Sequence, residues 1–222
     1  MVEQVRGITF AKHKDMLTEF KSRLKAKGYK YKCGILNSKD FYVPQERQRW
    51  ILIAVHKPKR KLKWPTGTRT WDPSVDTLPL VPFNKDTDVK YRLPPPNPRS
   101  KNRERILVKR AIAKSRKLGL CPKDLVVDIG CSLKYAVSKH NIWPTMTRTR
   151  CASKKYWVLR RGRQVRLSEI ARSFGLKSVK PLLSSRRVTL TQLCRMFGNT
   201  VVFDVCKAII AAALDASGFY SP

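Results

Sequence analysis

The first 56 residues carry patterns typical of a helix followed by two strands. The spacing predicts a helix over 9–28, ended by Gly28. Its apolar face is formed by Phe10, Leu17, Phe20 and Leu24. Apolar residues alternate with lysines over 29–36, which predicts a strand, and the apolar run over 50–55 predicts a buried strand of the kind found inside parallel or mixed sheets. This region is a piece of an α/β sheet, too short to be a whole one.

Three polar residues precede the apolar run at alternate positions. They are Gln45, Arg47 and Arg49. If the strand begins early, their side chains lie on the same face of the sheet. Burying two guanidiniums at the start of a buried strand costs free energy unless an anionic or polar group contacts them. The pattern therefore predicts a polar or anionic ligand at this position.

From Lys57 onward the chain becomes rich in proline and basic residues. The aromatic residues interleaved with them are Trp64, Trp71 and Tyr91. A basic helix is predicted over 103–118 and a strand over 125–129. High proline content is also typical of disorder, but the aromatic residues favour a small, loop-rich module that contacts a partner.

The pattern becomes regular again from Trp143. A helix is predicted with Ser168 as its N-cap and with Gly175 at its end. A closing amphipathic helix is predicted over 200–214. Its apolar face consists of Val202, Val205, Cys206, Ile209, Ile210 and Ala213. That face needs a hydrophobic partner.

The charge of the chain narrows the class of partner. The sequence has 48 Lys and Arg against 15 Asp and Glu, a net charge of +33. Such a balance favours a polyanion, DNA or RNA, over a merely basic surface, because neutralised phosphates release counterions. Two basic runs, 57–63 and 99–105, are either nuclear-import signals or strips that face DNA.

Cysteine spacing and hydropathy indicate the compartment. The six cysteines form no C-x-x-C pair and only three histidines are present, so no metal site is predicted. No signal peptide or apolar run of membrane length is seen, which predicts no membrane association and free thiols in a reducing compartment. We expect a nuclear protein if the source is eukaryotic and a cytoplasmic one otherwise.

The stretch L-V-V-D-I-G-C-S over 125–132 resembles the strand-to-glycine turn with which many methyltransferases hold S-adenosylmethionine. That turn needs several glycines so that the backbone can approach the ligand. Only Gly130 is present, and no glycine-rich helix entry follows. An ordinary strand and turn is therefore favoured.

Short motifs occur along the chain in a fixed order. They are E-Q-V at 3–5, V-P-Q-E-R-Q-R-W at 43–50, a long basic insert, P-T-M-T-R-T-R at 144–150, R-L-S-E-I-A-R-S-F-G at 166–175 and F-G-N-T-V at 197–201. This order resembles the C-terminal half of the DNA cytosine-5 methyltransferases. The resemblance covers residues 2–214. It implies an α/β fold: a partial doubly wound sheet, like that of S-adenosylmethionine-dependent methyltransferases, with a small irregular target-recognition module.

The resemblance also implies a division of the chain. Residues 1–56 would be the C-terminal part of the catalytic domain and 57–143 the target-recognition region. Residues 144–222 would organise that region and return to the catalytic domain as the closing helix. The expected partner is DNA, whose target cytosine must leave the stack because its C6 atom is out of reach in a duplex.

Individual roles follow from the matched motifs. Glu3 matches the glutamate at the N3 edge of the flipped cytosine, and Arg49 matches the arginine at its O2, with Arg47 and Gln45 in support. A guanidinium at O2 suits attack at C6, which pushes electron density towards O2 and N3. Without the resemblance, Glu3 is a free carboxylate near the N-terminus and Arg49 a residue of a solvated sheet edge. Gln4 departs from the family, which has Asn there.

The last motif implies a partial site for S-adenosylmethionine, formed by Asn199, Thr200 and Val201. Without the resemblance, this segment is a plain helix entry. Segment 166–175 departs from the family because it lacks a Gln before Gly175 and a Phe-Pro after it. The residues predicted to bind DNA are Gln45, Lys57, Lys59, Arg60, Lys61, Arg148, Arg150 and Arg166.

Two parts of the family pattern are absent. No Pro-Cys dipeptide supplies the nucleophile, since Cys121-Pro122 has the reverse order, and no glycine-rich cofactor turn occurs. We expect a chain that is inactive alone and completed by a second chain with both features. Alternatively, the chain is a truncated gene product or a degenerate copy retained for DNA binding. The alternative function is that of a non-catalytic basic DNA- or RNA-binding protein.

Overall fold

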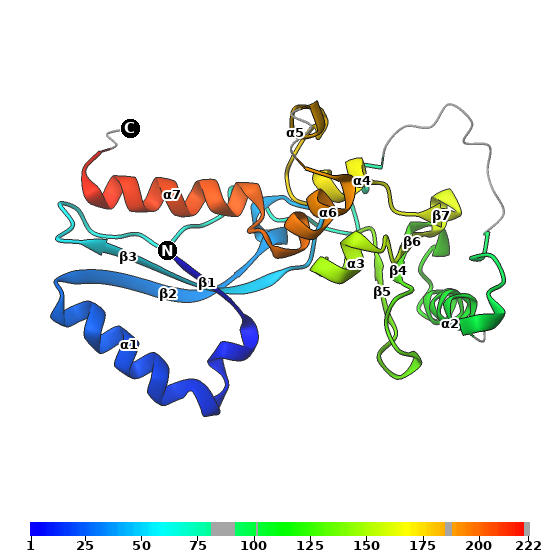
Figure 1. Cartoon of the computed structure of the whole chain (residues 1–222), viewed down its shortest axis with the longest axis horizontal. Helices are drawn as coiled ribbons and strands as arrows, with labels where there is room; N and C mark the ends of the chain where they lie inside the picture. The colour runs from blue at the N-terminus through cyan, green and yellow to red at the C-terminus, as the bar shows by residue number, and fades with distance from the viewer. Residues whose placement is uncertain (81–91, 101, 185–187, 220–222) are drawn as a thin grey trace. The chain divides into compact units, whose positions relative to one another are not determined.

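The computed structural model describes residues 1–80, 92–100, 102–184 and 188–219 (Figure 1). Tyr91 of the predicted recognition module and Lys101 of the second basic run lie outside the described residues. The chain forms two compact units. Unit 1 comprises Met1–Val43, Arg47–Thr70 and Val201–Pro222, and unit 2 comprises Pro44–Glu46 and Trp71–Thr200.

Unit 1 is built on a three-stranded antiparallel sheet in the order β1-β3-β2. Its strands are β1 (Val2–Val5), β2 (Tyr29–Asn37) and β3 (Gln48–His56). The predicted strands over 29–36 and 50–55 are confirmed, and the apolar run of β3 is buried. Both described neighbours of β3 are antiparallel, unlike those expected of a parallel or mixed sheet. An apolar run indicates that both faces of a strand are buried. It does not indicate whether the neighbouring strands are parallel or antiparallel.

Two helices flank this sheet. Helices α1 (Lys14–Ala26) and α7 (Phe203–Ser217) lie on opposite sides of it in Figure 1. The helix predicted over 9–28 begins later, because 3-10 turns occupy Arg6–Thr9 and Ala11–His13. Helix α1 packs on β2, where Leu17 and Leu24 of its predicted apolar face are half-buried, whereas Phe10 and Phe20 are exposed.

The closing helix α7 supplies much of the core of unit 1. Its residues Val205, Ile209 and Ala216 are buried, whereas Ile210, predicted on the same face, is exposed. The basic run 57–63 packs along the end of this helix. There, the backbone N–H of Arg60 donates to the carbonyl of Ala216 at 3.1 Å. This run therefore folds with the sheet of unit 1; the predicted functional boundaries at 56 and 143 stay predictions.

Unit 2 contains a four-stranded antiparallel sheet in the order β5-β4-β6-β7. The strands are β4 (Leu125–Asp128), β5 (Val137–His140), β6 (Tyr156–Val158) and β7 (Arg163–Gln164). Helix α2 (Arg103–Lys117) packs on β4 through Leu107 and Val108, which confirms the predicted basic helix and strand. The described part of unit 2 is thus a folded, loop-rich module; of the three aromatic residues that indicated one, Trp71 lies in this unit and Trp64 in unit 1.

Four short helices complete unit 2. They are α3 (Arg148–Ala152), α4 (Leu167–Arg172), α5 (Lys180–Ser184) and α6 (Leu190–Asn199). The predicted N-cap Ser168 lies inside α4, whose N-cap is Arg166. The Glu169 carboxylate accepts the Arg166 backbone N–H at 2.8 Å. The N-cap therefore lies two residues before the serine that the preference for serine at N-caps had indicated.

The length and hydropathy of the described helices bear on membrane association. No single described helix is long and apolar enough to cross a membrane. Helices α6 and α7 reach the length and hydropathy of a span only together, as a bent pair, and by length and composition alone.

Candidate functional site

The sheet of unit 1 brings Glu3 and Arg49 together. Glu3 of β1 pairs with Ile51 of β3, and Arg49 lies two residues before Ile51, so both side chains are on one face of the sheet. Arg49 Nε lies 3.1 Å from Glu3 Oε1, and the two side chains are 17% and 20% exposed. Two residues predicted from separate motifs thus form one ion pair, open on one side to solvent.

The pair retains unused hydrogen-bonding capacity. Burial lowers the pKa of the Arg49 guanidinium, and the neighbouring Glu3 carboxylate offsets part of that effect. Arg49 Nη1 also donates to the backbone carbonyl of Gln48 at 2.8 Å. Within the described part of the chain, Glu3 Oε1 is buried without an aligned hydrogen-bond donor. A ligand with adjacent donor and acceptor atoms could engage both side chains.

The early strand start that would put Gln45, Arg47 and Arg49 on one face does not occur. β3 begins at Gln48, so the alternation of a strand does not extend back to Gln45 and Arg47. Arg47 is buried, with its backbone N–H donating to Asn37 Oδ1 at 3.1 Å. Gln45 belongs to unit 2, where its buried side chain donates to the Ser173 carbonyl at 2.8 Å. A DNA contact by Gln45 would require that hydrogen bond to break.

The three residues predicted to contact the cofactor are also divided. Asn199 and Thr200 end α6 in unit 2 and line an open hollow, whereas Val201 belongs to unit 1. The hollow has amide and hydroxyl groups, but Arg148 and Arg195 also line it and none of its lining residues is acidic. S-adenosylmethionine has a net positive charge, because its sulfonium and ammonium groups outweigh its one carboxylate, so this cationic lining does not by itself fit the whole cofactor.

The predicted DNA-binding cations fall into two groups. Lys57, Lys59 and Lys61 of unit 1 are exposed, and between them Arg60 forms an ion pair with Asp215 at 3.1 Å. In unit 2, Arg150 lies 3.1 Å from Asp128, whereas Arg148 is exposed at the start of α3. Arg166, also in unit 2, is the N-cap of α4. The exposed cations are available to phosphate, and the paired ones also hold the fold.

Comparison with known proteins identifies the family. The sequence profile of the C-5 cytosine-specific DNA methylases matches residues 1–214. The chain belongs to this family. It is 33% identical to the type II methyltransferase M.XorII of Xanthomonas oryzae pv. oryzae over 81 residues, which are 35% of this chain and 19% of that protein.

A solved structure agrees with the fold. The crystal structure of S. pombe Dnmt2 methyltransferase superposes with a TM-score of 0.50 at 14% identity, covering 96% of this chain and 65% of that one. This likeness supports a mixed α/β, methyltransferase-like fold. The chain therefore spans less than two thirds of the length of either relative.

The sequence L-V-V-D-I-G-C-S is not a cofactor turn in this family member. Asp128 Oδ1 accepts the backbone N–H of Gly130 at 2.8 Å, which closes an ordinary turn after β4. A Cβ on Gly130 would meet the side chains of Arg150 and Lys155 at 2.8–2.9 Å. These two side chains thus pack directly against Gly130. The favoured interpretation, a strand and turn, is confirmed.

A buried ion pair in unit 2 was not predicted from the sequence. Glu169, fully buried in α4, accepts from Arg163 Nη1 at 2.9 Å and from Nη2 at 2.8 Å. It also accepts the Arg166 N–H noted above. The spacing Arg-x-x-Arg-x-x-Glu was a usable signal, because it allows one carboxylate to cap α4 and to pair with β7. This methylase motif segment is held by saturated polar contacts.

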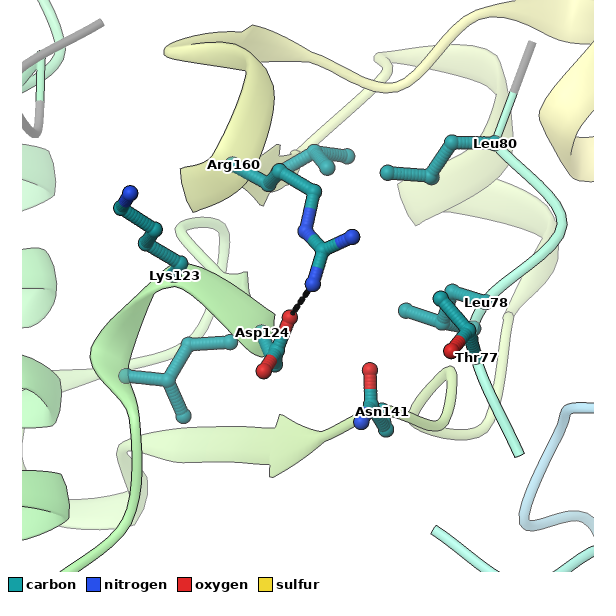
Figure 2. Close-up of a pocket in the computed structure, with 9 residues that line it drawn as sticks. Thr77, Leu78, Leu80, Lys123, Asp124, Asn141 and Arg160 are labelled. Carbon is teal, nitrogen blue, oxygen red and sulfur yellow. Dashed lines mark hydrogen bonds and ion pairs between the residues drawn. The ribbon is translucent and has the colours of Figure 1, made fainter. Parts of the chain in front are cut away.

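Unit 2 also has a small pocket between β6 and the loop over 77–80 (Figure 2). Figure 2 shows Arg160 reaching Asp124 across the pocket, and Asp124 also lies 3.7 Å from His140 Nε2. Leu78 and Leu80 form an apolar wall. The central carboxylate is thus engaged by neighbouring basic side chains, which is typical of a structural contact.

Proposed function

We propose that this chain is the target-recognising, C-terminal portion of a DNA cytosine-5 methyltransferase. Its substrate would be a cytosine flipped out of duplex DNA, with S-adenosylmethionine as methyl donor. The observation that carries the proposal is the Glu3–Arg49 pair, with Nε and Oε1 3.1 Å apart on a partly exposed sheet face.

The chemistry of cytosine suits this pair. Attack at C6 moves electron density towards N3 and O2 of the ring. A carboxyl group at N3 and a guanidinium at O2 stabilise that charge, and such preorganised donors act most strongly where water is excluded. Glu3 Oε1 is buried against Arg49, but the Glu3 side chain is 20% exposed, so its carboxylate can still meet the N3 edge. Arg47 would act as a positioning residue, because its backbone fixes the chain just before β3.

The nucleophile must come from elsewhere. No Pro-Cys dipeptide and no glycine-rich cofactor turn occur in the sequence. We propose that a second chain supplies the thiolate and most of the S-adenosylmethionine site, which also agrees with the poor fit of the α6 hollow to that cofactor. The bound cofactor supplies the methyl group; the residues of this chain hold the base and the DNA.

The test measures base flipping and methyl transfer separately. A duplex with 2-aminopurine beside a mismatched cytosine reports unstacking by a rise in fluorescence. We expect the wild-type chain to raise this signal and Arg49→Ala to lose most of it, while duplex affinity changes less than about threefold, because most affinity comes from other phosphate contacts. Tritium transfer from S-adenosylmethionine should need an added chain with the cofactor turn and Pro-Cys.

The matched control is Arg23→Ala, which removes another arginine of unit 1, paired with Glu19 on exposed α1. It should keep both signals. Equal fluorescence and transfer in wild type and Arg49→Ala would overturn the proposal. Strongly salt-dependent binding without any dependence on cytosine or cofactor would instead support the non-catalytic binder that the net charge of +33 also allows.

A further inference from the structure

Helices α3 and α6 of unit 2 border a continuous surface hollow. Two adjoining parts of it share Arg148 of α3 and Arg195 of α6. The other polar residues that line it are Thr149, Ser153, Thr191, Gln192, Asn199 and Thr200. Arg195 belongs to none of the motifs that identified the family.

The hollow is strongly cationic. Neither Arg148 nor Arg195 has a hydrogen-bond or ion-pair partner for its guanidinium among the described residues. None of the residues that line the hollow is acidic. Elsewhere in unit 2, arginines such as Arg150 and Arg163 are paired with carboxylates. Two unpaired guanidiniums facing one hollow repel each other unless an anion lies near both.

Close packing fixes the backbones that carry the two arginines relative to each other. A Cβ added to Gly198 near the end of α6 would overlap the backbone N and Cα of Arg148, so only glycine permits this approach. Beneath the hollow, Cys151 of α3 and Cys194 and Phe197 of α6 are buried. The start of α6 is fixed by Thr189, whose hydroxyl accepts the Gln192 N–H at 3.2 Å. Arg148 and Arg195 therefore project from a rigid frame.

We propose that this hollow binds a phosphodiester group of the DNA strand, held by Arg148 and Arg195 together. Guanidinium groups match the oxyanion of a phosphate in charge and in hydrogen-bonding geometry. The same pair would attract the carboxylate of S-adenosylmethionine but repel its sulfonium and ammonium groups, so a phosphodiester, which has only negative charge, fits better. The identity of the polyanion as DNA rests on the proposed function. Asn199 and Thr200 then line a phosphate site, in place of the cofactor contact that the family pattern implied.

Salt-dependent binding of a labelled duplex of about 20 base pairs tests the site. Each phosphate contact contributes about one to the slope of log K against log[KCl]. Arg148→Ala and Arg195→Ala should each lower this slope by about one and weaken binding by about tenfold at low salt, as for loss of a charged hydrogen bond. Arg195→Lys should keep the slope, because the charge remains.

The control is Arg116→Ala, an exposed arginine of α2 in the same unit. It should change affinity less than about twofold, and all variants should keep the wild-type melting temperature because these side chains are exposed. If the alanine variants of Arg116, Arg148 and Arg195 all lost the same small amount of duplex affinity, the proposed phosphate site would be wrong.

NMR of the arginine Nε–H groups distinguishes the possible ligands. The Arg148 and Arg195 signals should shift with the duplex, and weakly with inorganic phosphate. A larger shift with S-adenosylmethionine, or with single-stranded RNA than with the duplex, would contradict the proposal. Failure of Arg49→Ala to reduce base flipping would overturn the proposed function, whereas these slopes and shifts report on the hollow alone.

Discussion

Unit 1 and unit 2 each contain a conspicuous pair of a glutamate and an arginine. In unit 2, the fully buried Glu169 receives two N–H groups of Arg163 and one backbone N–H. In unit 1, Glu3 and Arg49 are partly exposed, and Glu3 Oε1 has no aligned donor among the described residues. The first carboxylate is saturated and organises a loop, whereas the second keeps capacity for a ligand.

This difference agrees with a structural role for Glu169 and with the proposed functional role of Glu3. A buried charge is tolerated only when paired and hydrogen-bonded, so removal of its partner is costly. A partly exposed pair contributes little to folding, because solvent screens it. Substitution of Glu169 should therefore lower stability more than substitution of Glu3. Substitution of Glu3 should lower activity more than substitution of Glu169.

The largest expected effect on stability is that of Glu169→Gln. The substitution leaves the Arg163 guanidinium without its carboxylate, and breaking a buried pair costs roughly 3 kcal/mol or more. Urea denaturation followed by circular dichroism measures the loss, and hydrogen exchange should locate it in unit 2. The exposed Glu19→Gln, which breaks an i,i+4 pair with Arg23, should cost at most about 0.5 kcal/mol. Similar losses of unfolding free energy in both variants would show that the Glu169–Arg163 pair contributes no more than an exposed pair.

An intermediate effect is expected for Tyr156→Phe, at another saturated polar group of unit 2. The buried hydroxyl donates to the Thr145 carbonyl at 3.1 Å and accepts the Thr147 N–H at 3.2 Å. Its loss leaves a backbone group unsatisfied, at a cost of about 1–2 kcal/mol. Thermal unfolding at neutral pH measures this cost; no change would show that water replaces the hydroxyl without penalty.

The same residue gives a pH test. Burial raises the pKa of the Tyr156 phenol above its ordinary value of about 10, and nearby Cys151 adds to the rise. The unfolded chain therefore loses this proton first, so the free energy of unfolding decreases as the pH rises above about 10. The contribution is complete below that pH. Tyr156→Phe should remove this part of the slope between about pH 10 and 11.

The smallest effect on stability is expected for Glu3→Gln. The pair with Arg49 is partly exposed, so the free energy of unfolding should fall by at most about 1 kcal/mol. In the tritium-transfer assay with the added chain, however, the variant should lose most of the activity, because an amide cannot protonate the N3 edge of cytosine. A loss of stability close to that of Glu169→Gln, with normal methyl transfer, would make Glu3 a structural residue.

Much of the secondary structure was predictable because it depends on local pattern. The strands β2 and β3, the helix α2 and the closing helix were found from alternation, apolar runs and helical spacing. The predictions were wrong about where some helices begin and about the direction of the strands beside β3. Phe10 lies before α1, Ser168 is not the cap of α4, and the described partners of β3 are antiparallel. Those features depend on side-chain hydrogen bonds and packing that residue spacing does not encode.

By itself, the sequence determined the family and predicted a polyanionic partner and roles for Glu3 and Arg49, because motif order and net charge depend on the sequence alone. Only the tertiary structure decided which of these residues meet. The register of β1 on β3 joins Glu3 to Arg49, whereas Gln45 and Thr200 pack with unit 2 and Arg47 and Val201 with unit 1. The packing of Gly198 on Arg148 brings in Arg195, which no motif had marked. Contacts between residues distant in sequence arise from strand register and close packing, which local patterns do not specify.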